Sequence, residues 1–269
     1  NVVTPRLSVI TPVDLDHQQY LGETLAEIAG EKAGIIKRNV PVVVGPQQDA
    51  ALEVIEARAA RLGAPVFAHG QHWQVSEERG RLVYQDEDGL LDLPVPNLVG
   101  SHQIQNAGTA LAALRVLGQG EAACEAAVTR ADWPGRMQRL TGRLAQLAAP
   151  AELWLDGGHN PHAGRAIAQT LRALPPKPTH LVCGMLNTKD VAGFMAPLAQ
   201  VADSLTAVSI PGEANTLPAD VTAARAAAAG LPATTAPSVQ DALKILAAPG
   251  RRILICGSLY LAGHVLRSE

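Results

Sequence analysis

Three kinds of polar side chain gather in one short stretch of the chain. Asp156, His159 and Asn160 share it with Gly157 and Gly158. An apolar run precedes the stretch and an Ala-rich helical pattern follows it. A strand, a Gly-containing turn and a helix place backbone N–H groups and polar side chains at the carboxyl edge of a sheet, where anionic ligands bind. A plain turn needs only Gly and perhaps Asn, so the three polar types favour a ligand site.

A second chemistry is open to the same residues. His159 as general base, Asp156 as its orienting partner and Ser258 as nucleophile would make a hydrolase. Ser258 follows Gly257 and precedes Leu259, which is not the G-x-S-x-G elbow of such enzymes. The sequence therefore disfavours the hydrolase alternative.

Strands and helices alternate in the N-terminal half. Helices are predicted at 23–33 and 49–61, and strands at 7–11, 40–44 and 65–68. This order indicates βαβ units and a parallel sheet. Residues 73–95 instead alternate polar and apolar with turn signals at Arg79-Gly80 and Asp88-Gly89, which predicts an antiparallel hairpin or small sheet.

After helices predicted at 102–117 and 120–131, Pro134-Gly135 marks a domain boundary. Beyond it the alternation resumes, with a surface helix at 219–230 and strands at 152–155, 180–183, 204–210 and 252–256. This pattern predicts a compact, doubly wound Rossmann-like domain of ordinary size.

Composition excludes several classes of protein. The net charge is −3 and the pI about 6.3, which gives no reason to expect binding to nucleic acid or an anionic membrane. The longest apolar runs are too short to span a membrane. Cys124, Cys183 and Cys256 lie in apolar surroundings without zinc-ligand spacing, so we expect buried thiols in a reducing, cytoplasmic compartment.

Five short strings occur in order along the chain. They are LDHQQYLG at 15–22, EKAGI at 31–35, PGR at 134–136, DGGHNP at 156–161 and GSLY at 257–260. Together they resemble the folylpolyglutamate synthase / dihydrofolate synthase family of the Mur-ligase superfamily. The resemblance covers almost the whole chain. It implies an α/β protein in which residues 1–133 are the remainder of a parallel-sheet ATPase domain and residues 134–269 a C-terminal Rossmann-like ligase domain.

The family's phosphate loop is missing from these residues, since no G-x-x-x-x-G-K-[ST] occurs. We therefore expect the chain to be the C-terminal part of a longer enzyme, weak in ATP binding and inactive by itself. A non-catalytic nucleotide-binding module is the alternative.

The resemblance assigns His17 and Lys32 to Mg²⁺, Lys32 as a lysine carbamylated by CO₂. Imidazole is an unusual ligand for so hard an ion, so the role of His17 depends on the family match. A surface or capping histidine is the alternative. Lys32 could instead be a solvated helix lysine, although Ala33 and Gly34 beside it favour a packed site.

Two further positions match nucleotide contacts in the family. The string HQIQNA at 102–107 resembles the helix whose Asn contacts adenine, which assigns Asn106 to that role with help from Gln103. A helix-start Asn is otherwise a cap or surface group. Arg136, at the hinge, could swing onto an ATP phosphate when the domains close.

In the C-terminal domain, the resemblance places Asp156 and His159 at the ribose and phosphates. Ser258 would help to bind glutamate, and Lys189 and Asp190 are weaker candidates for the same pocket. A helix-capping Asp beside a surface Lys explains the last pair equally well.

The implied enzyme is an ATP-dependent ligase that forms an acyl phosphate. It would add L-glutamate to dihydropteroate, to a folate already carrying glutamate, or to both, and would act as a monomer. Another Mur-type ligase, of peptidoglycan synthesis, is the alternative; the strings GSLY and EKAGI favour folate.

Overall fold

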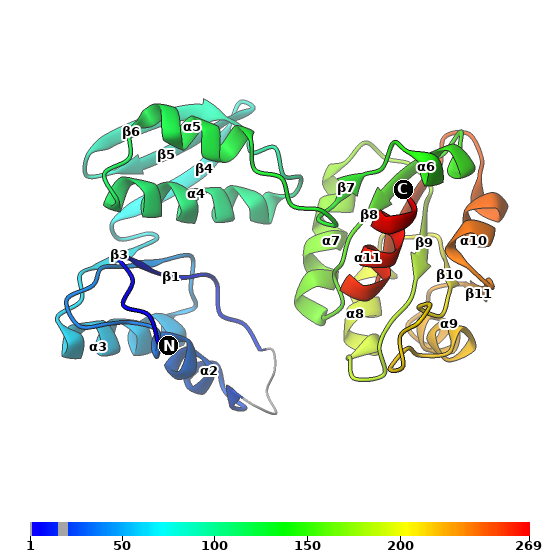
Figure 1. The fold of residues 1–269 in the computed structure, drawn as a ribbon, viewed down its shortest axis with the longest axis horizontal. Coiled ribbons are helices and arrows are strands. Elements are labelled where there is room, and N and C mark those ends of the chain that lie inside the picture. Colours follow the sequence, from blue (N-terminus) through cyan, green and yellow to red (C-terminus); the bar gives the residue numbers. More distant parts are fainter. Residues whose placement is uncertain (1, 16–20) are drawn as a thin grey trace. The chain divides into compact units, whose positions relative to one another are not determined.

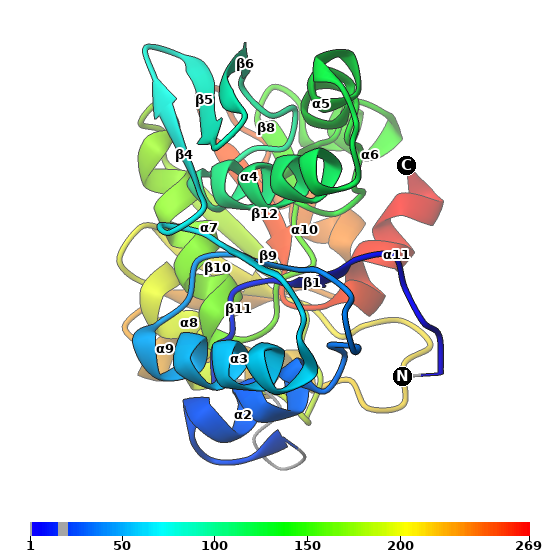
Figure 2. The same cartoon turned by 90° about the vertical axis from the view of Figure 1, so that its left-hand side faces the viewer.

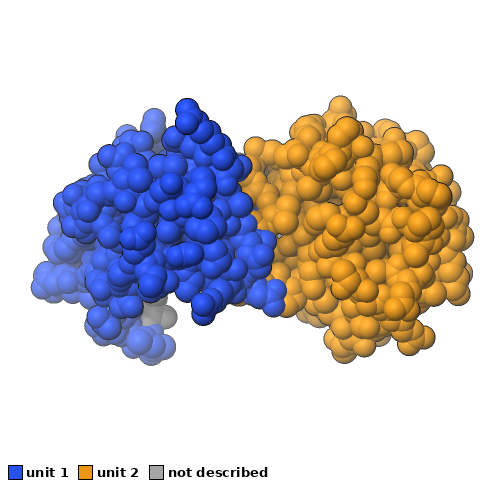
Figure 3. Space-filling model, turned by 90° about the horizontal axis from the view of Figure 1, so that it is seen from above, with its two compact units in different colours: residues 1–97, 102–132 blue, residues 98–101, 133–269 orange. Residues whose placement is uncertain are grey.

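The computed structural model describes residues 2–15 and 21–269. It separates into two compact units (Figure 3). Unit 1 comprises residues 1–97 and 102–132, and unit 2 comprises residues 98–101 and 133–269.

Unit 1 contains a parallel three-stranded sheet in the order β1-β2-β3 (Figure 1). Its strands are β1 (Ser8–Ile10), β2 (Val42–Val44) and β3 (Val66–Ala68), and its helices are α2 (Leu25–Ala33) and α3 (Asp49–Leu62). Val42 and Val44 face these helices, which lie side by side (Figure 2). Val43 points to the other face, because side chains alternate along a strand.

The predicted antiparallel segment is confirmed as a three-stranded sheet in the order β4-β5-β6. The elements are β4 (Trp73–Glu78), β5 (Arg81–Asp86), β6 (Gly89–Pro94), α4 (Ser101–Val116) and α5 (Glu121–Thr129). A Cβ on Gly108 would lie 2.7 Å from the Cβ of Val75, so glycine permits α4 to pack closely on β4.

Unit 2 is a six-stranded sheet in the order β11-β10-β9-β12-β8-β7, parallel except for β7. The strands are β7 (Gln138–Arg139), β8 (Glu152–Leu155), β9 (Thr179–Cys183), β10 (Ser204–Ala207), β11 (Ala233–Thr235) and β12 (Arg252–Cys256). The predicted strand at 204–210 ends early, because its pairing with β11 stops at Ala207. The sequence also missed β7, β11 and α6, which are short.

Helices cover both faces of this sheet, as a doubly wound fold requires. They are α6 (Arg143–Ala148), α7 (Pro161–Ala173), α8 (Val191–Leu198), α9 (Ala219–Ala228), α10 (Val239–Leu246) and α11 (Leu259–Ser268). The first face carries α7, α8 and α9, and the second carries α6, α10 and α11. Along β12, Leu254 enters the first core, whereas Ile253 and Ile255 enter the second. The α/β class predicted from the sequence is confirmed.

Within the described ranges, no helix is both long and apolar enough to cross a membrane.

Glu152, at the start of β8, fastens the loop that precedes β9. Its Oε1 atom accepts a hydrogen bond from Lys177 Nζ at 2.6 Å, and this bond is the main cause that lowers the pKa of Glu152. A carboxyl group whose pKa is lower in the folded state stabilises the fold above its unfolded pKa of about 4.3. That contribution disappears as the pH falls through the folded pKa.

We therefore expect Glu152→Gln to flatten the acid limb of the stability curve. Between about pH 5 and pH 3, the variant should lose less of its free energy of unfolding than the parent chain. Urea unfolding at a series of pH values measures this. Parallel acid limbs for the two chains would contradict the assignment.

Candidate functional site

The carboxyl edge of the unit 2 sheet gathers three helix N-termini. β8, β12 and β9 are parallel neighbours, and α7, α11 and α8 begin after them. Asn160 caps α7, Ser258 caps α11 and Asp190 caps α8. The N-terminus of a helix carries a partial positive charge. This edge is therefore suited to an anionic ligand.

Asp156 joins the two turns at this edge. One carboxylate oxygen accepts a hydrogen bond from Met137 N at 2.9 Å, and the other accepts one from Gly158 N at 2.7 Å. A third bond, from Gly157 N to Gly135 O at 2.7 Å, fastens the same turns. The turn at 134–137 and the turn at 156–160 are thus one bonded assembly.

Arg136 is held between two residues with left-handed backbone. Gly135 has φ +72° and Met137 has φ +37°. A non-glycine residue at positive φ is strained and persists only where its surroundings determine it. Here the Met137 side chain is buried and its N–H donates to Asp156. The backbone of Arg136 is therefore held in position, while the residue itself is exposed.

Burial is the largest influence on Asp156, which is only 6% exposed, and it raises the pKa of the carboxyl group. The two backbone N–H donors, Arg136 and His159 oppose this shift. The bonds therefore offset part of the cost of holding this carboxylate away from water.

His159 is oriented by the backbone. Its Nδ1 lies 2.9 Å from Gly157 O. A carbonyl can only accept, so Nδ1 carries the proton and Nε2 is the atom available to a ligand. Because Nδ1 is engaged by Gly157, it does not bond Asp156, whose oxygens accept Met137 N–H and Gly158 N–H. This arrangement disfavours the hydrolase alternative.

Ser258 lies at the same edge, after β12. It is 3% exposed, and its Oγ accepts a hydrogen bond from Tyr260 N at 3.0 Å. Asp190 Oδ1 accepts a bond from Gly193 N at 2.9 Å and is exposed, and Lys189 beside it is partly exposed. The structure thus gives Asp190 the capping role that the sequence left open.

In unit 1, Gln103 and Asn106 form a connected pair on α4. Asn106 Nδ2 donates to Gln103 Oε1 at 3.0 Å, and Gln103 Nε2 lies 3.0 Å from His102 Nε2. Gln103 is 6% exposed. The bond fixes the Asn106 amide, so its carbonyl oxygen is the acceptor it presents.

The metal assignments receive no support from the described residues. Lys32 lies in the last turn of α2 with its side chain exposed, so the expectation of packed surroundings was wrong. His17 falls outside the described residues. Among residues 2–15 and 21–269, no three His, Cys, Asp or Glu side chains are grouped to hold a metal ion.

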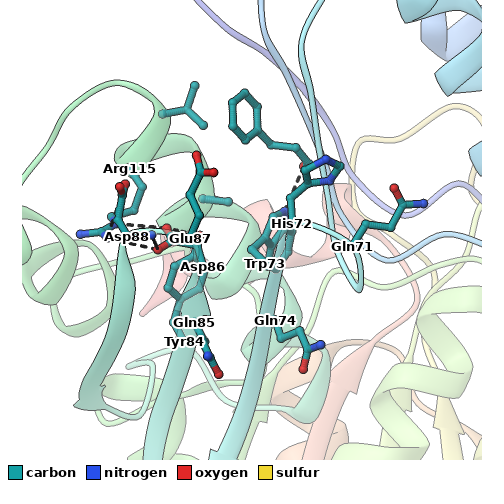
Figure 4. A pocket seen from close by; sticks show the side chains of 13 residues that line it. Gln71, His72, Trp73, Gln74, Tyr84, Gln85, Asp86, Glu87, Asp88 and Arg115 are labelled. Atoms are coloured by element: carbon teal, nitrogen blue, oxygen red, sulfur yellow. Dashed lines mark hydrogen bonds and ion pairs between the residues drawn. The ribbon is translucent and has the colours of Figure 1, made fainter.

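Sequence reasoning missed a cavity of about 610 Å³ in unit 1 (Figure 4). Arg115 bonds both carboxylate oxygens of Asp86 at 3.1 Å, and Tyr84 Oη donates to Asp86 at 3.2 Å. Burial, followed by the charge of Asp86, raises the pKa of Tyr84. Figure 4 shows His72 on the opposite side from Arg115. Asp86 and Arg115 are 29 positions apart, so no local spacing could have revealed their pairing.

We expect Asp156→Asn to destabilise the chain by about 1–3 kcal/mol. An amide retains one acceptor oxygen but turns N–H donors toward Met137 N or Gly158 N, so one bond is lost. Urea unfolding measures the change. The control is Asp190→Asn, which should be nearly neutral because Asn caps a helix as well as Asp does. Equal effects of the two substitutions would show that the Asp156 bonds are unimportant.

Comparison with known proteins finds similarity to Mur ligases and, among them, to folylpolyglutamate synthases. Residues 135–259 match the Mur ligase, glutamate ligase domain. The folylpolyglutamate synthase of Lacticaseibacillus casei is 33% identical over 98% of this chain and 62% of its own length.

Two solved structures share the fold of the whole chain. Escherichia coli FolC in complex with DHPP and ADP has a TM-score of 0.85 and 30% identity, over 98% of this chain and 61% of its own. Mycobacterium tuberculosis folylpolyglutamate synthase complexed with ADP and AMPPCP has a TM-score of 0.85 and 30% identity, over 99% of this chain and 64% of its own. This chain thus spans about three fifths of the length of these relatives. Residues 135–259 thus match the glutamate ligase domain of Mur ligases, and the chain shows strong homology to folylpolyglutamate and dihydrofolate synthases.

Proposed function

We propose that the enzyme containing this chain joins L-glutamate to a folate or to dihydropteroate, using ATP. The observation that carries the proposal is the edge where Arg136 and His159 extend from two turns bonded to Asp156, beside three helix N-termini. Relatives named for this activity, one of them solved with DHPP and ADP, support folate over a peptidoglycan precursor.

The proposed reaction has two steps. A carboxylate oxygen of the folate attacks the γ-phosphorus of ATP, which gives an acyl phosphate and ADP. The amine of glutamate then attacks the acyl carbon, phosphate leaves, and the amine loses a proton. Such chemistry needs the phosphates held and their charge stabilised more than it needs a protein nucleophile.

The residues take the following roles in the proposal. Asn106 and Gln103 contact the adenine, and Arg136 and His159 contact the phosphates. Ser258 contacts glutamate through its hydroxyl proton. Its oxygen already accepts Tyr260 N–H, so the proton is the group that it can offer to a ligand. Lys189 and Asp190 are further candidates for the glutamate pocket, supported only by their position after β9.

Asp156 acts in this proposal as a positioning residue. Its two bonds keep Arg136 and His159 on one rigid assembly. A direct contact between Asp156 and the ribose stays a prediction. A reducing compartment, as in the cytoplasm, is supported by three free and buried cysteines, Cys124, Cys183 and Cys256. A monomeric enzyme is also proposed.

Arg136→Ala and His159→Ala should each lower kcat more than they change the KM for ATP. Contacts to phosphate strengthen as charge develops in the transition state. Losing one typically costs about 2–4 kcal/mol, roughly 30- to 1000-fold in rate. Steady-state kinetics of glutamate ligation by the complete gene product would measure these losses.

The double variant provides the sharper test. Both residues extend from the assembly that Asp156 holds, so the double variant should be less impaired than the product of the single losses. Arg225→Ala, which removes an exposed arginine on α9, is the matched control and should keep normal rates. Strictly multiplicative losses, or effects on KM alone, would leave two independent binding contacts.

The role of Lys32 as a carbamylated ligand near Mg²⁺ bound by His17 is also proposed, and it depends on the family alone. Lys32→Ala should then lower kcat/KM, the parent enzyme should depend on bicarbonate, and formate or acetate should restore part of the lost activity. Lys244→Ala, which removes another exposed lysine, is the control. If the Lys32→Ala enzyme kept the parent kcat/KM, Lys32 would be an ordinary helix lysine.

A further inference from the structure

A second cavity, of about 390 Å³, lies in unit 2 at the opposite edge of the sheet. Its lining includes Arg172, Lys177, Thr179, Gln200 and Arg252. Thr179 and Arg252 are the first residues of β9 and β12, whereas Ser258 lies two residues beyond Cys256, the last residue of β12. At about 3.3 Å per residue, the length of β12 separates this cavity from the carboxyl edge by roughly 13 Å.

The cavity contains a buried cation. The side chain of Arg252 is 2% exposed. Its Nη2 donates to Pro175 O at 2.8 Å, but Nε has no hydrogen-bond acceptor among the described residues. A carboxylate oxygen of Glu152 lies 3.8 Å from Nε, too far for a hydrogen bond.

That carboxylate is shared by three cations. Glu152 Oε1 lies 2.6 Å from Lys177 Nζ and 3.7 Å from Arg139 Nη2, and Oε2 lies 3.8 Å from Arg252 Nε. One negative charge therefore faces three positive charges. Arg172 adds a fourth at the cavity wall, where none of the lining residues is Asp or Glu.

The desolvation of Arg252 makes this imbalance costly. Burial lowers the pKa of its guanidinium, and Glu152 only partly opposes the shift. A buried charge is stable only when it is paired and hydrogen-bonded. The Glu152 carboxylate already accepts its shortest hydrogen bond from Lys177. Asp203, nearby, accepts a bond from Thr179 N instead.

We propose that this cavity binds a phosphate-type oxyanion, held by Arg252, Lys177 and Arg172. A tetrahedral dianion supplies the negative charge that Glu152 cannot, and its oxygens suit the planar donor set of arginine. Free phosphate and the phosphate of a small metabolite share this chemistry. The site is separate from the carboxyl edge. A failure of this proposal would therefore leave the proposed ligase function unaffected, and a failure of the ligase function would leave this proposal unaffected.

Thermal unfolding of the full chain in sodium phosphate, with sodium chloride of equal ionic strength as reference, is the first test. A ligand that binds only the folded state raises Tm with concentration. We expect a saturable rise with phosphate and with sulfate, and no such rise with chloride. Equal effects of all three salts would mean screening only and would overturn the proposal.

Two variants with opposite expected effects sharpen the test. Lys177→Gln removes a donor and frees Glu152 to pair with Arg252, so the Kd for phosphate should rise by about tenfold. Glu152→Gln removes the competing carboxylate, so phosphate should bind more tightly. Arg225→Gln makes the same charge change as Lys177→Gln at an exposed position of α9 outside the cavity. It should leave the Kd for phosphate unchanged.

Two results would contradict the proposed phosphate site. Weaker binding in Glu152→Gln, or equal losses in Lys177→Gln and Arg225→Gln, would overturn the site. Circular dichroism checks that each variant folds; if Glu152→Gln does not, the Lys177→Gln comparison decides alone. Glycerol 3-phosphate binding more tightly than inorganic phosphate identifies a phosphorylated metabolite, and the reverse identifies free phosphate.

Discussion

The carboxylate of Asp156 is the constraint on which the candidate site depends. Its two oxygens accept N–H groups from residues 19 positions before it and two positions after it, so they join turns that local sequence does not connect. Met137 holds a left-handed backbone that few non-glycine residues adopt. The bond to Asp156 and the burial of the Met137 side chain offset this strain. Arg136 is positioned as a consequence, because it lies between Met137 and Gly135.

The two edges of the unit 2 sheet differ in charge because the helices run antiparallel to the strands. The carboxyl edge receives helix N-termini, which favour anions, and the amino edge receives helix C-termini, which favour cations. Arg172, in the last turn of α7, fits this rule. A helix terminus contributes only about 0.3–1 kcal/mol at an exposed site, however. The rule therefore accounts for Arg172 but not for Arg252, whose buried charge needs a closer partner than Glu152 provides.

The sequence predicted the strands that are long enough to show a hydrophobic pattern and that are bounded by turn residues. β8 and β12 begin and end where they were predicted, because each is an apolar run bounded by turn residues. β7 and β11 have two and three residues, too few for a period to appear. The role of Asp156 was missed for another reason: its partner is a backbone N–H, which leaves no mark on residue type. The exposure of Lys32 was also missed, because small neighbours in sequence do not determine packing in space.

The groups at the carboxyl edge are oriented by the backbone rather than by one another. His159 Nδ1 bonds Gly157 O, Ser258 Oγ accepts Tyr260 N–H, and the Asp156 oxygens accept two further N–H groups. A proton relay needs side chains that bond in series, as in a Ser-His-Asp triad. Side chains fixed singly, around helix N-termini, instead offer donors at set positions to a charge that the substrate brings. That geometry suits phosphoryl transfer, in which the protein contributes position and electrostatic stabilisation while ATP supplies the leaving group.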